Sequence, residues 1–418
     1  MTINDQFVST GGSGNRKNNP SSGNPSHHDS KHAGRGKQHL YSAISSRTIQ
    51  GNSRVHSSDA NRFQNVPLDK FVGEIFSLCR DQHGCRYLQK KLEENNPQYL
   101  DIIYSETKDR FVELMTDPFG NYLCQKLIYY TDEDQLTVIV KNCVPHLIPI
   151  AFNQYGTRAL QKMIESLKSP YQVSLIINAL KGSVVELIRD LNGNHVIQKC
   201  LNCLSHEQAQ FIYDVVGKNC VVVGTHRHGC CVLQRCIDHA SPEQKDQLVA
   251  VIVRNALSLV QDQFGNYVTQ YVLDLGLSKY INPLIEEFLG HICEMSLQKF
   301  SSNVMEKCIR ISEPSQRSAI IREILVAEKL DQLLRDSYGN YVVQTAIDSA
   351  DLSLRAELID TIKPLLPVIR NTPYGRRIYS KIGGLPPQPA ASGMDSSTRI
   401  KKQAITPEPE HFGILNSY

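Results

Sequence analysis

The sequence predicts an all-α solenoid, in which similar helical units stack side by side and share one core. Two observations carry this prediction. A motif of the type DQFGNYVTQ occurs nine times, and its successive copies lie 36 to 38 residues apart. Apolar residues at helical spacing fill the intervals between short polar breaks. A unit of this length cannot bury its apolar face alone, so a fixed period of this size is typical of a stacked array.

The motif copies align at one small residue. That position holds Gly84, Gly120, Gly156, Gly193, Gly229, Gly265, Ser301, Gly339 and Gly375. We interpret the glycines as points where two helices approach closely, and not as phosphate-binding loops. We assign the aromatic residue before them to core packing, as at Phe119, Tyr155, Phe264, Tyr338 and Tyr374.

The sequence also marks where the helices begin. In the sixth unit, Ser241-Pro242-Glu243 is a helix start, because proline and an acid both suit the first turn. Residues 248–260 follow with a broad apolar face. Asp262, three residues before Gly265, can cap the next helix. The same offset holds Asp81, Asp117, Asn153, Asp190, Asp336 and Thr372, so the motif should occupy the first turns of a helix.

The two ends of the chain differ from this repeat region. Residues 1–61 are expected to form a disordered basic tail and residues 385–418 a second disordered tail, which leaves 62–384 as the folded domain. Residues 1–65 hold eight Lys/Arg and three Asp, so the rest of the chain carries 3 − 5 = −2 of the net charge of +3. A polyanion would therefore have to meet basic groups gathered on one face.

Composition indicates the cellular compartment in which the protein is expected. The N-terminus lacks the features of a signal peptide, and no run approaches the ~20 apolar residues of a membrane span. The 12 cysteines are spread through apolar segments, which is typical of reduced, buried thiols. We predict a cytoplasmic protein, monomeric and without membrane contact.

Each motif carries one set of three side chains that could contact a ligand. The set comprises the residue after the glycine, the next residue, and the one three further on. The first and third lie one helical turn apart on one face. The eight sets are Cys85, Arg86 and Gln89; Asn121, Tyr122 and Gln125; Thr157, Arg158 and Gln161; Asn194, His195 and Gln198; Cys230, Cys231 and Gln234; Asn266, Tyr267 and Gln270; Ser302, Asn303 and Glu306; and Asn340, Tyr341 and Gln344.

These sets suit the recognition of unstacked bases. Two polar side chains one turn apart can hydrogen-bond the Watson–Crick edge of a base, and Tyr, His or Arg planes can stack on its faces. A single Asn/Gln pair on a helix is usually solvated surface. Repetition at one register argues against that reading, and the array predicts a single-stranded RNA-binding face. The ninth motif has Arg376, Arg377 and Ser380 at these positions, and we interpret it as a cap.

Two cysteine clusters invite a metal-site interpretation. His226 and His228 precede Cys230 and Cys231, and Cys200 and Cys203 form a CxxC pair without a second pair at zinc-site spacing. The motif register already places Cys230 and Cys231 among the base-reading sets, and we assign the CxxC pair to the core. We therefore expect no metal and no cofactor. We also expect no enzymatic activity, because no catalytic constellation is recognisable.

The strings GNYVVQ, SSNVMEK, HRHGCCVLQRC and NGNHVIQK closely resemble those of the Pumilio-homology (PUF) family, above all its fungal members. The resemblance covers about residues 62–384. It implies a right-handed α-α superhelix, a crescent-shaped solenoid of eight three-helix Pumilio repeats with partial capping repeats. It also implies that single-stranded RNA lies along the concave face, antiparallel to the protein, so that the eighth repeat reads the 5′ base.

By the same resemblance, Asn with Gln looks like a uracil reader, Cys or Ser with Gln an adenine reader, and Ser with Glu a guanine reader; Thr157 with Gln161 is a less decisive adenine reader. The expected site is then 5′-UGUAUAUA or a close variant. Thr157 and Cys231 depart most from the family pattern, and both eight-base and extended sites stay open. The resemblance implies binding to mRNA 3′ untranslated regions, with repression or decay through a recruited deadenylase or corepressor complex. The alternative is an armadillo- or HEAT-like protein-interaction solenoid.

Overall fold

The computed structural model describes residues 63 and 65–383, and both predicted tails lie outside the described residues. All described residues belong to one compact unit that begins at Arg62. Within this part of the chain the regular structure is helical, with no strand.

Each repeat holds a short helix, a motif helix and an outer helix, in that order along the chain. The motif helices are α3 (Gln82–Glu93), α6 (Gly120–Tyr130), α9 (Gly156–Glu165), α12 (Gly193–Cys203), α15 (Gly229–His239), α18 (Gly265–Asp274), α21 (Ser301–Ile311), α24 (Gly339–Ser349) and α27 (Gly375–Lys381). The outer helices are α4 (Pro97–Thr107), α7 (Glu133–Cys143), α10 (Pro170–Leu180), α13 (Gln210–Lys218), α16 (Pro242–Arg254), α19 (Ser278–Phe288), α22 (Pro314–Ile324) and α25 (Leu352–Ile362).

The short helices connect one repeat to the next. They are α2 (Ile75–Cys79), α5 (Phe111–Met115), α8 (Leu147–Phe152), α11 (Val184–Arg189), α14 (Cys220–Gly224), α17 (Ala256–Val260), α20 (Ile292–Ser296), α23 (Ala327–Arg335) and α26 (Leu366–Ile369). Single 3₁₀ turns lie at η1 (Leu68–Phe71), η2 (Lys108–Arg110), η3 (Val144–His146), η4 (Lys181–Ser183) and η5 (Lys363–Leu365).

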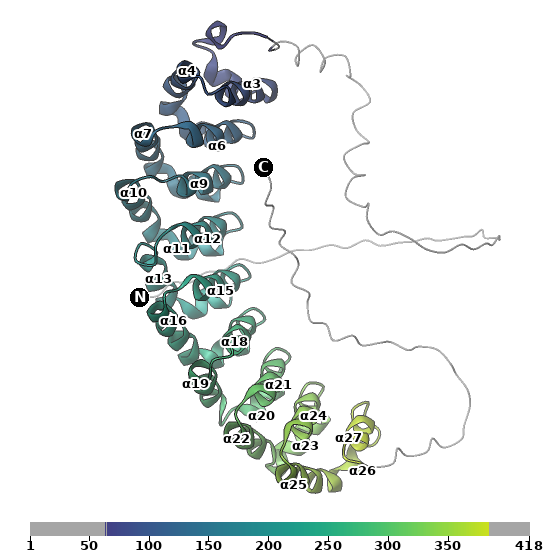
Figure 1. The fold of residues 1–418 in the computed structure, drawn as a ribbon. Helices are drawn as coiled ribbons and strands as arrows, with labels where there is room; N and C mark the ends of the chain where they lie inside the picture. Colours follow the sequence, from purple (N-terminus) through teal and green to yellow (C-terminus); the bar gives the residue numbers. More distant parts are fainter. Residues whose placement is uncertain (1–62, 64, 384–418) are drawn as a thin grey trace, which may run out of the picture. The chain divides into compact units, whose positions relative to one another are not determined.

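The repeats stack in sequence order, which agrees with the predicted solenoid. Each motif helix from α3 to α24 contacts the motif helix of the next repeat, and together they line the inner edge of the curved row (Figure 1). The outer helices follow the outer edge (Figure 1). Between the two layers, the buried apolar residues form one continuous core from Phe63 to Ile378. The motif residues are thereby placed side by side along one surface.

The predicted caps are present at the motif helices. Asp117 Oδ1 accepts hydrogen bonds from the N–H groups of Phe119 at 2.9 Å and Gly120 at 2.8 Å. A side-chain oxygen at the same offset accepts from the motif glycine at Asp81, Asn153, Asp190, Asp262, Asp336 and Thr372. Such a cap stabilises a helix by about 1 kcal/mol. In the fifth repeat, His226 replaces the acid, and its Nδ1 accepts from the His228 N–H at 3.3 Å.

The motif glycines stand where two helices meet, as predicted. A Cβ at Gly265 would lie 2.5 Å from the carbonyl oxygen of Leu259, six residues earlier, on the preceding short helix. Ser301 is the one departure from glycine among the nine motifs, and it is fully buried. Its hydroxyl donates to the carbonyl of Met295, again six residues earlier, at 2.6 Å. The two helices therefore still approach closely here, and a hydrogen bond joins them.

Two helical runs are longer and more apolar than the sequence analysis expected. Residues Glu133–Phe152 and Pro170–Arg189 each span 20 residues, with mean hydropathies of 1.3 and 1.2, and could cross a membrane by length and composition alone. Each run joins an outer helix through a 3₁₀ turn to the next short helix. Several of their apolar side chains, such as Leu136, Val140 and Ile150, are buried in the common core, whereas Val138 and Tyr171 are exposed. Over the most apolar 18 residues of each run, 39% and 33% are buried.

The aromatic residues before the motif glycines are less buried than predicted. Phe264 and Tyr374 pack against the core, but Phe119 and Tyr338 each keep 37% of their surface exposed. The difference arises because this position precedes the motif helix, at the rim of the inner face. The assignment of all these residues to the core was therefore wrong in part.

Candidate RNA-binding interface

The first residue of every predicted reading set is buried at the seam between motif helices. Cys85, Asn121, Thr157, Asn194, Cys230, Asn266, Ser302 and Asn340 are all at most 5% exposed. The seam places them against the next repeat: Cys85 Sγ donates to the Phe119 carbonyl at 3.1 Å, and Thr157 Oγ1 to the Asn192 carbonyl at 3.2 Å. A base approaching the inner face can therefore reach only an edge of this side chain.

The four asparagines at this position share one orientation. Asn194 Nδ2 donates to the carbonyls of Asp190 and Leu191, both at 2.8 Å, and Asn266 Nδ2 likewise to those of Asp262 and Gln263. Asn121 Nδ2 donates to the carbonyls of Asp117 and Pro118, and Asn340 Nδ2 donates to that of Asp336. Because the amide nitrogen is directed to the backbone in all four, each Asn presents its Oδ1 acceptor toward the reading Gln.

The third residue reaches back toward the first. Gln Nε2 donates to Asn Oδ1 at 3.2, 2.8, 2.9 and 3.0 Å in repeats two, four, six and eight. In repeats one and three, Gln89 donates to Cys85 Sγ at 3.3 Å and Gln161 to Thr157 Oγ1 at 3.2 Å. Each of these glutamines keeps its Oε1 and a second N–H for another partner. Gln234 differs, because it donates to the Tyr267 carbonyl at 3.4 Å.

The middle residue of each set projects from the inner face. Tyr122 is 59% and Tyr267 41% exposed, and Arg86, Arg158, His195, Cys231 and Asn303 are exposed as well. Tyr341 is less exposed than these residues. Arg377 Nη1 donates to its hydroxyl at 3.2 Å, and its ring lies 6.5 Å from that of Tyr374. Flat side chains from successive repeats are thus available to stack on bases.

The pKa of His195 is lowered by burial and by the nearby Arg158 and His228, which favours the neutral imidazole. Burial, together with neighbouring cations, also lowers the pKa values of His226 and His228. Neutral imidazole rings suit stacking, and the neutral Nδ1 of His226 is the acceptor that caps the fifth motif. A charged His226 could not accept that hydrogen bond.

Cysteines differ sharply in their surroundings. Cys230 is buried, while Cys231 is exposed on the reading face with its sulfur 3.9 Å from that of Cys230. The hydrogen bond between the two thiols lowers the pKa of Cys231. Cys200 is buried as predicted, whereas Cys203, which we also assigned to the core, is exposed. Across the described residues no group of three or more His, Cys, Asp or Glu is arranged to hold a metal ion.

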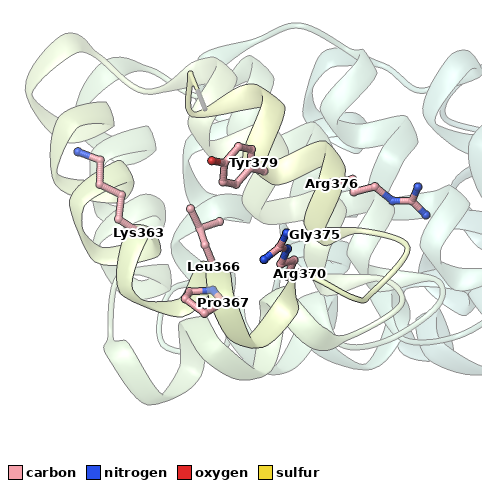
Figure 2. A pocket seen from close by; sticks show the side chains of 7 residues that line it. All are labelled: Lys363, Leu366, Pro367, Arg370, Gly375, Arg376 and Tyr379. Carbon is pink, nitrogen blue, oxygen red and sulfur yellow. The ribbon is translucent and has the colours of Figure 1, made fainter. Parts of the chain in front are cut away.

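The ninth motif closes the row. Arg376 stands at the position that is buried in the other repeats, and α27 ends six residues after its glycine. At this end a cavity of about 460 Å³ is lined by three cations, Lys363, Arg370 and Arg376, with Leu366, Pro367, Gly375 and Tyr379 (Figure 2). The motif Ser380 supplies no amide or carboxylate that could read a base, and the capping role of this motif stays a prediction.

The structure also shows contacts that sequence reasoning missed. Residues immediately after the reading Gln or Glu meet residues of the preceding repeat, as in the 2.7 Å ion pair between Lys126 and Glu93. The reading Glu306 itself has partners, Arg310 and Thr345. A signal was available, since basic residues recur directly after the reading position.

A family model described as the Pumilio-family RNA binding repeat matches this chain eight times, at residues 74–107, 110–142, 146–180, 183–216, 219–253, 255–289, 291–325 and 331–363. Each match spans one motif helix with all or most of its short and outer helices, and the last match begins inside α23. The ninth motif lies after the last match.

Relatives in fungi and plants are similar over most of the chain. A Pumilio domain-containing protein of Schizosaccharomyces pombe is 54% identical over 334 residues, which are 80% of this chain and 49% of that protein. Pumilio homolog 12 of Arabidopsis thaliana is 44% identical over 313 residues, 74% of this chain and 52% of the relative. The chain thus spans about half the length of these curated relatives.

Solved structures show the same architecture. The Puf4 RNA-binding domain bound to the HO endonuclease RNA 3′ UTR recognition sequence is 44% identical, with a TM-score of 0.66 over 74% of this chain and 99% of that one. The RNA-binding domain of yeast Puf5p bound to AAT2 RNA is 35% identical, with a TM-score of 0.68 over 76% of this chain and 97% of that one. This chain therefore belongs to the Pumilio family of RNA-binding repeat proteins.

Proposed function

We propose that this protein binds single-stranded RNA sequence-specifically, one base per repeat, at sites of the form 5′-UGUAUAUA or a close variant. The observation that carries the proposal is the row of eight reading sets. Each combines a seam residue, a polar side chain one turn on, and a projecting side chain between them. The row repeats along a single surface of the described unit, with one set per motif helix.

The geometry of the Asn/Gln sets supports uracil. The Watson–Crick edge of uracil is an N3–H donor between two carbonyl acceptors. Asn266 offers an acceptor at Oδ1, and Gln270 offers both an acceptor and a donor. One amide pair can therefore accept from N3–H and donate to a carbonyl. The same arrangement recurs in repeats two, four and eight, which would read bases seven, five and one in an antiparallel strand.

The sets with Cys or Thr before Gln support adenine. Its edge has one acceptor, N1, beside one donor, the N6 amine, and a single glutamine amide can pair with both. At Gln89 and Gln161 the residue at the seam is small and holds the amide through one hydrogen bond. Gln234 is turned toward the Tyr267 carbonyl, so repeat five would have to release that bond to read base four.

Glu306 distinguishes repeat seven and supports guanine at base two. Guanine presents two donors, N1–H and N2–H, side by side, and a carboxylate offers only acceptors. A glutamine at this position would place a donor against one of them. Each well-placed bidentate contact discriminates by about 1–3 kcal/mol.

We further propose that the protein acts in the cytoplasm on mRNA 3′ untranslated regions. Its effect there would be translational repression, or deadenylation and decay, through recruited partners. The Puf4 domain is bound to a 3′ UTR recognition sequence, which supports this class of target. The buried, free cysteines are compatible with a reducing compartment.

Selection of the full chain from a random RNA pool tests the proposal. We expect enrichment of UGUA followed by alternating U and A. A variant carrying Gln198→Ala and Gln270→Ala is the matched control, and it should lose preference at bases five and three only. Failure to enrich any RNA above the unselected pool would refute the proposal and favour the protein-interaction solenoid.

A further inference from the structure

Beside the reading row runs a second row of contacts, which we call the inter-repeat ladder. In it, the residue directly after the reading Gln or Glu meets the residue four positions after the reading Gln or Glu of the preceding repeat. Lys199 Nζ lies 3.5 Å from Glu165 Oε2, and Lys307 Nζ lies 2.5 Å from Asp274 Oδ1. The same register holds the pairs Lys126 with Glu93, Tyr271 with Asp238, and Lys381 with Asp348.

The ladder changes its chemistry between repeats seven and eight. Arg310 stands where five repeats carry an acid, Glu93, Glu165, Asp238, Asp274 and Asp348, and where two others carry Tyr129 and Asn202. Thr345 stands where six repeats carry Lys90, Lys126, Lys162, Lys199, Arg235 and Lys307, and where repeat six carries Tyr271. Among the eight repeats, a cation replaces the acid only in repeat seven, and this is also the repeat whose reading set ends in glutamate.

Arg310 and Thr345 converge on the reading carboxylate. Arg310 Nη2 lies 2.7 Å from Glu306 Oε2, and the Thr345 hydroxyl donates to the same oxygen at 2.8 Å. Arg310 Nη2 also donates to Thr345 Oγ1 at 3.0 Å, which closes a three-membered network across the repeat boundary. Both hydrogen bonds to the carboxylate fall on Oε2, and Oε1 keeps its acceptor positions.

The network supplies partners to a largely buried carboxylate. The Glu306 side chain is 18% exposed, and Thr345 is 6% exposed. Hydrogen-bonding and charged partners stabilise a carboxylate at such a site by replacing the water it has lost. The ordinary ladder could not provide them, because an acid at position 310 would repel Glu306 within one helical turn. A lysine at position 345 would place a mobile cation, able to donate several hydrogen bonds, against the acceptors that guanine needs.

We propose that Arg310 and Thr345 are positioning residues for guanine: they hold the Glu306 carboxylate by Oε2, so that its remaining acceptors face the second base. The proposal rests on the proposed function, in which Glu306 reads that base. It extends the specificity determinant of repeat seven from the reading set to two residues outside it, one of them on the following repeat.

Binding of four eight-base RNAs tests the proposal with the full chain. The probes are 5′-UGUAUAUA and its variants with A, U or C at base two, and the measured quantity is the ratio of each variant's Kd to that of the G probe. We expect the unchanged protein to prefer G by about 5- to 150-fold. Arg310→Ala and Thr345→Val should each reduce this ratio at least fivefold. Arg310→Lys and Thr345→Ser should restore most of it.

Two controls separate positioning from a merely structural role. Lys199→Ala breaks a ladder contact of the ordinary kind far from Glu306, and it should leave the base-two ratio within twofold. In a Glu306→Gln background, Arg310→Ala should no longer change the ratio, because the carboxylate it positions is gone. Thermal melting of each variant identifies any loss of folding, and Arg310→Ala, at a side chain that is 55% exposed, keeps the test valid if Thr345→Val unfolds.

The outcomes are distinct. If the protein without substitutions showed no preference for G at base two, the proposed function of Glu306 itself would be refuted. A protein that prefers G, but whose Arg310→Ala and Thr345→Val variants keep the same ratio, would overturn the positioning role alone. An equal loss of affinity for all four probes counts as the same refutation, since it shows a general structural effect.

Discussion

Replacing Ser302→Asn together with Glu306→Gln should change the preferred second base from guanine to uracil. Ser302 is buried at the same seam position as Asn194 and Asn266, and its hydroxyl already donates to the Lys299 carbonyl, three residues earlier, at 3.4 Å. An asparagine amide there can reach the carbonyls three and four residues earlier, as Asn194 does. Its Oδ1 would then accept from the new glutamine and reproduce the uracil-reading geometry.

The size of the change follows from the two contacts that are exchanged. Losing the guanine contacts costs about 1–3 kcal/mol, and gaining the uracil contacts contributes about as much. The ratio of Kd values for 5′-UGUAUAUA and 5′-UUUAUAUA should therefore shift by about 2–6 kcal/mol, which is roughly 30-fold or more. Fluorescence anisotropy with both labelled RNAs measures this ratio directly.

A reverse change provides the control for this switch. Asn266→Ser with Gln270→Glu, made together with Asp274→Arg and Lys307→Thr so that the ladder beside position 270 matches that of repeat seven, should move the preference of the third base from uracil to guanine and leave the second base unchanged. If the variant of repeat seven still preferred guanine at base two, either the assignment of bases to repeats or the reading chemistry would be wrong. If its preference changed at another base instead, only the assignment of bases to repeats would be wrong.

The remaining predictions concern stacking, reactivity, packing and charge. Tyr267→Ala should weaken every target by about 1–3 kcal/mol without changing base preference, whereas Tyr171→Ala, on an outer helix, should leave RNA affinity unchanged, as anisotropy titration can show. Iodoacetamide at pH 7 should modify Cys231 faster than Cys203, because the pKa of Cys231 is lowered whereas burial raises that of Cys203. Peptide mass spectrometry measures both rates, and bound RNA should slow the modification of Cys231. Ser301→Ala should lower the free energy of unfolding by about 1–3 kcal/mol, since the methyl group keeps the close approach and loses the hydrogen bond; urea denaturation checks this value. Affinity should depend weakly on salt, with a log–log slope of about −2 or smaller in size, against about −5 if every phosphate of an eight-base site were neutralised.

Much of this fold could be predicted from the sequence because its information is local and repeated. A cap such as Asp262 and the glycine three residues later act within one helical turn, so each motif copy reports the same helix start. The close approach at Gly265 involves a carbonyl only six residues away. Repetition then multiplies a weak local signal, and the positions of the motif helices follow from it.

What the sequence did not reveal depends on the neighbouring repeat. Thr345 and Glu306 are 39 residues apart, and their hydrogen bond exists only because α21 and α24 pack side by side. The exposure of Phe119 and Tyr338 likewise depends on where the inner face ends, which local periodicity does not define. The burial of the first reading residue is a property of the seam between two repeats. A pattern within one helix cannot express it.

The ladder also bears on where binding energy and selectivity arise. Lys126, Lys199 and Lys307 all lie beside the reading row, yet each is within 3.5 Å of a carboxylate, so their charge is offset before any RNA arrives. Free cations attract every phosphate equally and would raise affinity for all sequences alike. With these cations paired, stacking on exposed rings such as Tyr122 and hydrogen bonds to base edges carry a larger share of the binding energy. In the proposed complex the base contacts alone would distinguish one sequence from another, so a ladder that suppresses nonspecific attraction would increase the selectivity of the eight proposed reading sets.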